Sequence, residues 1–244
     1  LVSRKFAHRF NHEGSYPTVQ PRRFVKKLII AIDGPSGAGK GTLARTLASR
    51  LGYQHVDTGA MYRAVAWKAA HDGLSLDDDG AVSAVATGAV LDQADGRITI
   101  DGHDVTRAIR TPEIDKAAAS VARLPHVREV LVGRQRAMGA SGAVVMEGRD
   151  IGTVVFPDAD IKIYLDASAE ERARRRASDD AHTGGQGSLA NVQSELVARD
   201  KTDSTRAVAP LTLAKDAIYI DTTEMPIEVV VNHVMMLLHE KLNG

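Results

Sequence analysis

The order of apolar and polar positions divides most of the chain into alternating strands and helices. A continuous apolar run at Leu28–Ile32 is typical of a strand buried on both faces of a parallel sheet. After a glycine-rich stretch, Leu43, Leu47 and Leu51 recur at intervals of four, which places them on one face of a helix. The other predicted elements include strands at residues 144–146, 161–165 and 218–220 and a final helix at 226–242. This alternation predicts an α/β fold with a mostly parallel sheet.

Two segments interrupt the alternation. Residues 74–110 contain two β-rich runs, 89–92 and 97–100, separated by an Asp-Gly turn, and they predict a small lobe with a hairpin. Residues 179–188 contain Gly184, Gly185 and Gly187 between two helical patterns, which indicates a mobile hinge or the tip of a loop. Inserted lobes that swing over a site are used by transfer reactions that must exclude water.

Composition excludes several classes of protein. The chain has 244 residues, no Cys, and 31 basic against 31 acidic residues, so thiol chemistry is excluded and no nucleic-acid partner is expected. No run approaches the roughly 20 apolar residues that a membrane span needs. Residues 1–27 hold seven basic residues and one acid. We expect residues 1–26 to form a flexible basic extension without a catalytic role, the alternative being part of a targeting segment.

The strongest chemical signal follows the first predicted strand. The pattern Gly34-x-x-x-x-Gly39-Lys40 lies directly between a strand and a helix, as in phosphate-binding loops. Its glycines let backbone N–H groups curl around a phosphate, and Lys40 can reach the β- and γ-phosphoryl oxygens. A turn used only for packing would explain neither the lysine nor the loop length. The predicted nucleotide-binding residues are Gly34, Pro35, Ser36, Gly37, Ala38, Gly39, Lys40, Gly41 and Thr42.

A phosphate-binding loop does not by itself define a reaction. GTPases usually read guanine with Asn-Lys-x-Asp, and the chain has no such tetrapeptide. The only echo of a switch motif is Asp77-x-x-Gly80, for which a solvated acidic turn is the simpler interpretation. These observations favour a small-molecule kinase over a regulatory GTPase.

Arginines at the ends of predicted elements strengthen the kinase interpretation. Arg63 lies early in a predicted helix, Arg149 follows the strand at 144–146, and Arg206 ends a helical segment. Guanidinium groups suit phosphate oxygens, and α/β proteins bind ligands at the carboxyl ends of their strands. Each arginine alone is equally well explained as a surface charge, an ion pair or a helix cap. Together with the loop they favour a binding site.

Four motifs together resemble those of bacterial cytidylate kinases over about residues 27–242. They are Ile32–Thr42, Asp57–Arg63, Glu147–Pro157 and Arg206–Leu211. The late hydroxyl at Thr42 fits, because nucleoside monophosphate kinases characteristically carry Gly-Lys-Gly-Thr. The resemblance implies transfer of the γ-phosphoryl group of ATP to CMP or dCMP with Mg²⁺. It also implies a three-layer P-loop fold with a mostly parallel central sheet, a monophosphate-binding lobe at about 74–110 and a helical lid at about 177–206.

The resemblance also assigns roles to single residues. The catalytic groups would be Lys40, Arg63, Arg149 and Arg206, the three arginines holding the acceptor phosphate. Cytosine would be read near Thr58, Ser120, Arg128 and Asp150, and ribose by Arg199 and Asp203. Thr42 would hold Mg²⁺ with water. The chain departs from the family at Thr58, often Ser in relatives, and at Lys201-Thr202 and Ser204-Thr205, where some relatives have arginines.

This chemistry needs no acid/base triad, because a monophosphate already presents an anionic oxygen as nucleophile. Asp150 is then a recognition residue that accepts a hydrogen bond from the cytosine amine, where uracil would present a carbonyl. For the run Arg172, Arg174, Arg175 and Arg176, a solvated helix face is the simpler interpretation for most members.

Two alternatives stay open from the sequence. One is a P-loop kinase for another small acceptor, such as UMP or a non-nucleotide alcohol. The other is a nucleotide-binding regulatory factor that has lost transfer and uses its basic extension to contact RNA or an acidic partner. The nine histidines form no metal-binding pattern, so we expect no built-in metal. We further expect a cytoplasmic monomer with small-molecule substrates.

Overall fold

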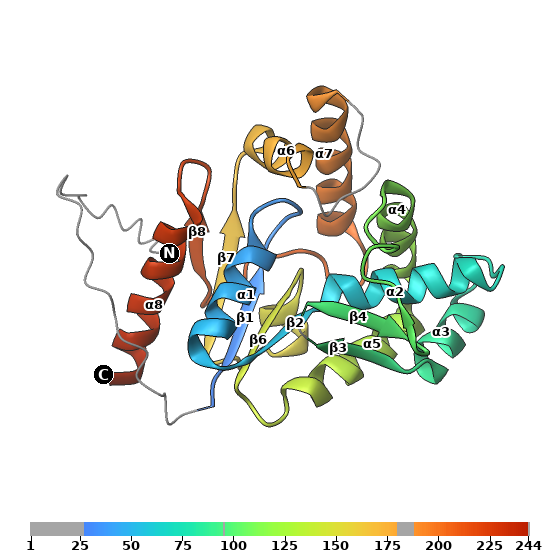
Figure 1. Cartoon of the computed structure of the whole chain (residues 1–244), viewed down its shortest axis with the longest axis horizontal. Coiled ribbons are helices and arrows are strands. Elements are labelled where there is room, and N and C mark those ends of the chain that lie inside the picture. Colours follow the sequence, from blue (N-terminus) through green and yellow to red (C-terminus); the bar gives the residue numbers. More distant parts are fainter. Residues whose placement is uncertain (1–26, 95, 180–187, 244) are drawn as a thin grey trace.

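The computed structural model describes residues 27–94, 96–179 and 188–243 (Figure 1). The basic segment 1–26 and the predicted hinge glycines Gly184, Gly185 and Gly187 lie outside the described residues. At the centre is a parallel sheet of five strands in the order β2-β6-β1-β7-β8. The strands are β1 (Ile29–Asp33), β2 (Gln54–Asp57), β6 (Val144–Gly148), β7 (Ile161–Asp166) and β8 (Ile218–Asp221). The predicted α/β fold with a mostly parallel sheet is confirmed.

Helices cover both faces of this sheet and make it the middle of three layers. Successive residues of β1 point to opposite faces. Ile30 and Ile32 pack into a core with α1 (Lys40–Leu51) and α8 (Ile227–Asn243). Ala31 packs into the other core with α2 (Thr58–His71) and α5 (Pro125–Gly139). All three β1 side chains are fully buried, which is why this strand is apolar without alternation.

The interruption at residues 74–110 folds as a small lobe beside α2. It contains α3 (Asp79–Gly88) and an antiparallel sheet of β3 (Leu91–Ala94), β4 (Arg97–Ile100) and β5 (His103–Asp104). The first hairpin strand therefore begins two residues later than the pattern suggested. The acidic turn is also partly a helix start, because Asp78 caps α3 by accepting from the Ala81 amide at 2.9 Å.

Three further helices lie near the carboxyl edge of the central sheet. They are α4 (Pro112–Val121), α6 (Ala169–Ala177) and α7 (Leu189–Thr205). Their starts follow ordinary capping rules, since Thr111, Ser168 and Ser188 each accept a backbone N–H of the first turn. Helices α6 and α7 pack together, and α7 also contacts α4 across the upper part of the molecule (Figure 1).

A short π-helix was not predicted from the sequence. Residues Ile151–Val155 form a π-helix, η1, in the connection between β6 and β7. Single π-turns are rare in proteins and frequent at functional sites. Among the described residues, no helix combines the length and apolar character that crossing a bilayer requires.

Two glycines at the ends of helices test how tightly the layers pack. Gly142 (φ +67°) and Gly52 (φ +68°) share a left-handed backbone, but a Cβ at Gly142 would lie 2.3 Å from the Lys27 carbonyl oxygen, whereas one at Gly52 would meet nothing within 4 Å. Gly52→Ala should therefore cost about 1 kcal/mol of unfolding free energy, and Gly142→Ala about 1–3 kcal/mol more. Urea unfolding of both variants measures the difference. Equal losses would show that the Lys27 segment gives way freely.

Candidate active site

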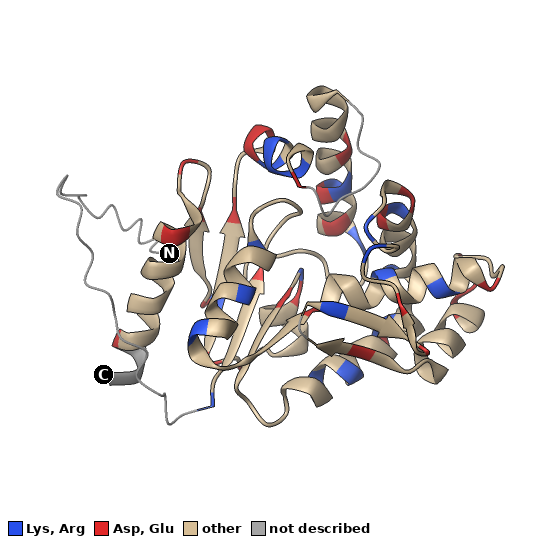
Figure 2. Ribbon diagram, in the orientation of Figure 1, with Lys and Arg blue, Asp and Glu red and all other residues tan. Residues whose placement is uncertain are grey.

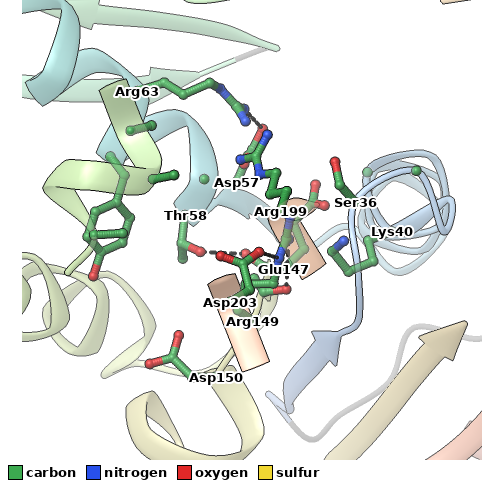
Figure 3. A pocket seen from close by; sticks show the side chains of 18 of the residues that line it. Ser36, Lys40, Asp57, Thr58, Arg63, Glu147, Arg149, Asp150, Arg199 and Asp203 are labelled. Carbon is green, nitrogen blue, oxygen red and sulfur yellow. Dashed lines mark hydrogen bonds and ion pairs between the residues drawn. The ribbon is translucent and has the colours of Figure 1, made fainter. Parts of the chain in front are cut away.

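A cavity of about 390 Å³ opens at the carboxyl edge of the central sheet, between the phosphate-binding loop, α2, the segment after β6, and α7 (Figure 3). Most of the predicted site residues line it. They are Ser36, Gly37, Gly39, Lys40, Gly41, Thr42, Thr58, Arg63, Arg128, Arg149, Asp150, Arg199, Asp203 and Arg206. One cavity therefore collects side chains that are separated by as many as 170 positions in the sequence.

The loop itself is shaped by its contact with the neighbouring strand. A Cβ on Gly34 would lie 2.0 Å from the Leu165 carbonyl oxygen, so only glycine allows the chain to leave β1 so close to β7. Gly34, Pro35 and Ala38 do not line the cavity and serve its frame. At the far end of the loop, Lys40 begins α1 and its Nζ donates to the Pro35 carbonyl at 2.6 Å.

Lys40 is an almost fully buried cation, with 6% of its surface exposed. Burial, and next the positive charge of Arg149, lower the pKa of Lys40 to about 7. Glu147, Asp33 and Asp57 act in the opposite direction. A buried lysine near its titration point gains its full charge when an anion arrives beside it. The loop thus has a donor that is poised for phosphate.

Carboxylates hold two of the predicted phosphate-binding arginines. Arg63 Nη2 contacts Asp57 Oδ2 at 3.0 Å, and Arg149 Nε contacts Asp203 Oδ2 at 2.8 Å (Figure 3). Burial alone would raise the pKa of Asp57 and Asp203, but the paired guanidinium groups hold both below the ordinary aspartate value. Asp57 also caps α2 by accepting from Ala60 N. Both arginines therefore have fixed orientations in the free protein.

A second charged group forms the inner wall. Arg128 on α5 donates to Asp150 Oδ2, and both side chains are less than 10% exposed. Arg206 Nη2 lies 3.6 Å from Asp150 Oδ1, and its Nε donates to the Ala209 carbonyl. The Arg128 guanidinium also lies 5.7 Å from the centre of the Tyr62 ring. Burial raises the pKa of Tyr62 to about 12, so its hydroxyl stays neutral.

Some buried guanidinium N–H groups make no hydrogen bond. Among the described residues these include Arg63 Nε, Arg199 Nε and Arg206 Nη2. Buried donors are almost always satisfied in folded proteins, so unsatisfied ones in a cavity wall point to a ligand that accepts from them. All three arginines line the same cavity.

Ser120 is the one predicted substrate residue that does not line this cavity. It lines a neighbouring cavity of about 390 Å³ between α4 and α7, which shares only Ala119, Arg176 and Arg199 with the first. Arg199 Nη1 lies 3.1 Å from Asp115 Oδ1, and Arg176 Nη2 contacts Asp115 Oδ2. Asp115 on α4 therefore joins α6 and α7. It was not predicted, because nothing local in α4 marks an aspartate as the partner of distant arginines.

The expectation of a solvated arginine face on α6 is wrong for three of the four residues. Only Arg174 is exposed. Arg172 is buried, donating to the Ser36 carbonyl at 3.1 Å and pairing with Asp200 at 2.6 Å. Arg175 binds the Thr222 carbonyl, and Arg176 lines the cavity. Several elements cover this face: Asp200 of α7 and the Ser36 carbonyl contact Arg172, Thr222 contacts Arg175, and Asp115 of α4 contacts Arg176. A periodicity argument for α6 alone does not include these partners.

The residues around Thr42 suit a hard divalent cation that arrives with a nucleotide. Thr42 is exposed at the cavity wall, and Glu147, held by His55 Nε2 at 3.0 Å, adds a carboxylate to the same cavity. Hydroxyl and carboxylate oxygens are the donors that Mg²⁺ prefers. Across the described ranges, no group of three or more His, Asp or Glu side chains forms a metal site by itself.

Basic and acidic residues are interleaved on the helices above the sheet (Figure 2). In the cavity, however, nine arginines and Lys40 stand against five carboxylates. Beyond the predicted residues, the cavity wall includes Arg45, Asp57, Arg110, Glu147, Arg175, Arg176 and Asp179. An excess of positive charge that is partly shielded from water suits a ligand with several phosphate groups.

Comparison with known proteins agrees with this geometry. The sequence model of the family described as cytidylate kinase matches residues 30–240. Curated cytidylate kinases from Pelotomaculum thermopropionicum and Desulfitobacterium hafniense are 52% and 49% identical, over 84% and 89% of this chain and 93% and 95% of theirs. One from Solibacter usitatus is 46% identical over 90% of this chain and 95% of its own.

Among solved structures, a shikimate kinase from Bacteroides thetaiotaomicron aligns with 87% of this chain and 98% of its own at 13% identity, with a TM-score of 0.49. The match to the family extends from β1 into α8 and includes every segment that contributes to the cavity. The chain belongs to the cytidylate kinase family.

Proposed function

We propose that this protein transfers the γ-phosphoryl group of ATP to CMP or dCMP, producing ADP and CDP or dCDP. The observation that carries the proposal is a single cavity that joins the phosphate-binding loop and Lys40 to Arg63, Arg149 and Arg206, with the Arg128–Asp150 pair at its inner wall. Family membership supports the same reaction.

In this reaction an oxygen of the acceptor phosphate attacks the γ-phosphorus of ATP, and the bond from that phosphorus to the β–γ bridging oxygen breaks. The leaving ADP takes the electron pair, and no general base is required. Catalysis is then alignment and stabilisation of charge on the transferred group. Lys40 and the arginines supply the positive charge, and the unsatisfied N–H groups of Arg63 and Arg206 supply free donors. Bound Mg²⁺, held by Thr42 and water, would neutralise the donor phosphates.

Base recognition falls to the inner wall. Asp150 is fixed by Arg128 and has its second oxygen 3.6 Å from Arg206, so its carboxylate is oriented before a substrate binds. A carboxylate accepts from the exocyclic amine of cytosine and repels the carbonyl that uracil has there. Thr58 lines the same cavity as Asp150, and its hydroxyl donates to the Glu147 carbonyl at 2.7 Å. Arg199 and Asp203 remain our candidates for ribose, and Ser120, which lines the neighbouring cavity, remains a candidate for cytosine.

The acceptor specificity is tested by ADP release with ATP and Mg²⁺ against CMP, dCMP, UMP and AMP, with an acceptor-free control. Strong turnover of CMP and dCMP and weak turnover of UMP and AMP is the expected result. A preference for UMP would mean that UMP is the acceptor, and ATP binding without acceptor-stimulated turnover would favour the binding-factor alternative. A cytoplasmic location and a monomeric state belong to the same proposal and are measured by fractionation and light scattering.

Asp150→Ala should reduce the ratio of kcat/KM for CMP to that for UMP by about 10–100-fold while UMP turnover changes less, because only cytosine donates to this carboxylate. Asp150→Asn keeps one acceptor oxygen, so its CMP-to-UMP ratio of kcat/KM should lie between that of the parent and that of Asp150→Ala. The matched control is Asp57→Asn: this carboxylate holds a phosphate-binding arginine, and Asn still caps α2, so both substrates should lose rate alike. Equal losses for the two bases in Asp150→Ala would contradict the assigned role.

Lys40→Met should abolish most transfer, by several orders of magnitude, and yet stabilise the free protein. The pKa of Lys40 is about 7 in the folded state and about 10.5 when unfolded, so the unfolded chain binds this proton more tightly. Folding is therefore penalised as the pH falls through this window, and removing the lysine removes the penalty. The gain in unfolding free energy should grow as the pH falls from about 10 to 7, reaching at most about 4 kcal/mol.

Denaturant unfolding at pH 7, 8 and 9 measures this gain. Lys162→Met is the matched control, because Lys162 is also buried but its Nζ contacts Asp216 at 2.8 Å and donates to the Pro157 carbonyl, and the loss of these contacts should lower stability. A Lys40→Met variant that is less stable than the parent at pH 7 would show that Lys40 supports the fold rather than the site.

A further inference from the structure

The π-helix η1 begins directly after Asp150, the residue that we assign to base recognition. Its first two backbone N–H groups, of Ile151 and Gly152, lack partners within the turn. Both donate instead to Asp33, Ile151 N to Oδ1 at 2.8 Å and Gly152 N to Oδ2 at 2.7 Å. One carboxylate therefore fixes the two peptide groups that follow Asp150.

Asp33 lies on the other side of the chemistry. It is the last residue of β1, immediately before Gly34, where the phosphate-binding loop starts. In the sheet it pairs with Gly148 of β6, and only 5% of its surface is exposed. Asp33 does not line the cavity itself. It links the start of the phosphate-binding loop to the segment that carries Asp150.

The contact is built for a carboxylate and a glycine. Both oxygens of Asp33 are used, and a Cβ on Gly152 would lie 3.3 Å from Asp33 Oδ2 and 3.1 Å from Lys162 Cδ. Glycine therefore allows the amide to approach. The far end of η1 is held too, since Arg136 donates to the Val154 and Val155 carbonyls at 2.7 and 3.0 Å. With both ends bonded, the turn has little freedom to move.

Charge favours the same arrangement. Burial raises the pKa of Asp33 to about 6, while the amides of Gly152 and Ile151 act to keep it ionised. Asp150 raises this pKa further, and Lys40 lowers it. A buried carboxylate keeps its charge only where such donors surround it, so the two amides and Asp33 stabilise each other.

We propose that Asp33 is a positioning residue: by binding the two amides after Asp150, it sets the direction of the Asp150 carboxylate and with it the discrimination between acceptor bases. This role rests on the proposed function of Asp150. It also explains why an acidic residue that does not line the cavity stands at the buried end of an apolar strand.

The test compares Asp33→Asn with the parent. Asparagine has the same shape, but its NH₂ group faces one of the two amides, which then lacks an acceptor. We expect the CMP-to-UMP ratio of kcat/KM to fall by about tenfold, with a smaller change in the KM for ATP. In Gly152→Ala the added methyl group should push the Gly152 amide away from Asp33, so this variant should show the same fall in the CMP-to-UMP ratio. It serves as the second variant if Asp33→Asn folds poorly.

A merely structural role predicts a different result. Gly142→Ala should destabilise the fold at a position that does not line the cavity, and its CMP-to-UMP ratio should match that of the parent. In the Asp150→Ala background, Asp33→Asn should produce no further fall in the ratio, because its effect passes through Asp150. The proposal would be overturned if Asp33→Asn lowered the CMP-to-UMP ratio by the same factor with and without Asp150→Ala. It would also be overturned if Asp33→Asn raised the KM for ATP and left this ratio unchanged.

A measurement without turnover separates this role from the proposed function. Hydrogen exchange of the amides in residues 151–155 should accelerate at least about tenfold in Asp33→Asn, while the amides of β6 stay protected. If the parent shows no preference for CMP but exchange in η1 responds, Asp33 still fixes the turn, and the base-reading role of Asp150 is what fails. Unchanged exchange in η1 would overturn the positioning role itself.

Discussion

The positive charge gathered at one edge of the sheet is the constraint on which the rest of this structure depends. Nine arginines and Lys40 share a cavity with five carboxylates, although the whole chain has no net charge. Without fixed partners, such cations would repel one another and turn outward to water. Carboxylates on neighbouring elements prevent this, as the pairs of Arg63 with Asp57 and Arg149 with Asp203 illustrate. The remaining excess of positive charge is left for phosphate groups to neutralise.

This arrangement divides the work between fixed and free donors. An arginine held at one nitrogen by a carboxylate keeps its orientation while its other N–H groups stay available. Arg63 fits this description, with Nη2 bonded to Asp57 and a buried Nε without a hydrogen bond. Lys40 contributes differently, because burial brings its pKa to about 7 and leaves its full charge to be recovered when phosphate binds. The burial of Lys40 therefore lowers the stability of the free protein, and a bound phosphate would offset this loss.

Local patterns were enough to predict the central sheet and the phosphate-binding loop. The β1 strand and the leucines of α1 are contiguous in sequence, so their order and spacing carry the information. Arg172 shows where this ends: its burial depends on α7 and on the Ser36 carbonyl, 136 positions away. Asp115 and Asp33 were missed for the same reason, since each matters through partners on other elements. The roles proposed for Arg63, Arg149 and Arg206 came from the family resemblance, because arginines alone are as often ion pairs as ligands.

The order of the strands explains why donor and acceptor groups meet. β1 is central, and the chain runs from it through α1 to β2 at one edge of the sheet, while β7 lies on its other side. Ligand sites in such sheets form where neighbouring connections leave in opposite directions. β6 fills the place between β1 and β2, so the segment that carries Arg149 and Asp150 emerges beside the phosphate-binding loop. A side chain at the end of β1 needs to reach only one strand across to bind that segment, and Asp33 does so. The fold thus brings the phosphate-binding loop and the segment to which we assign base recognition to the ends of adjacent strands, where one buried carboxylate joins them.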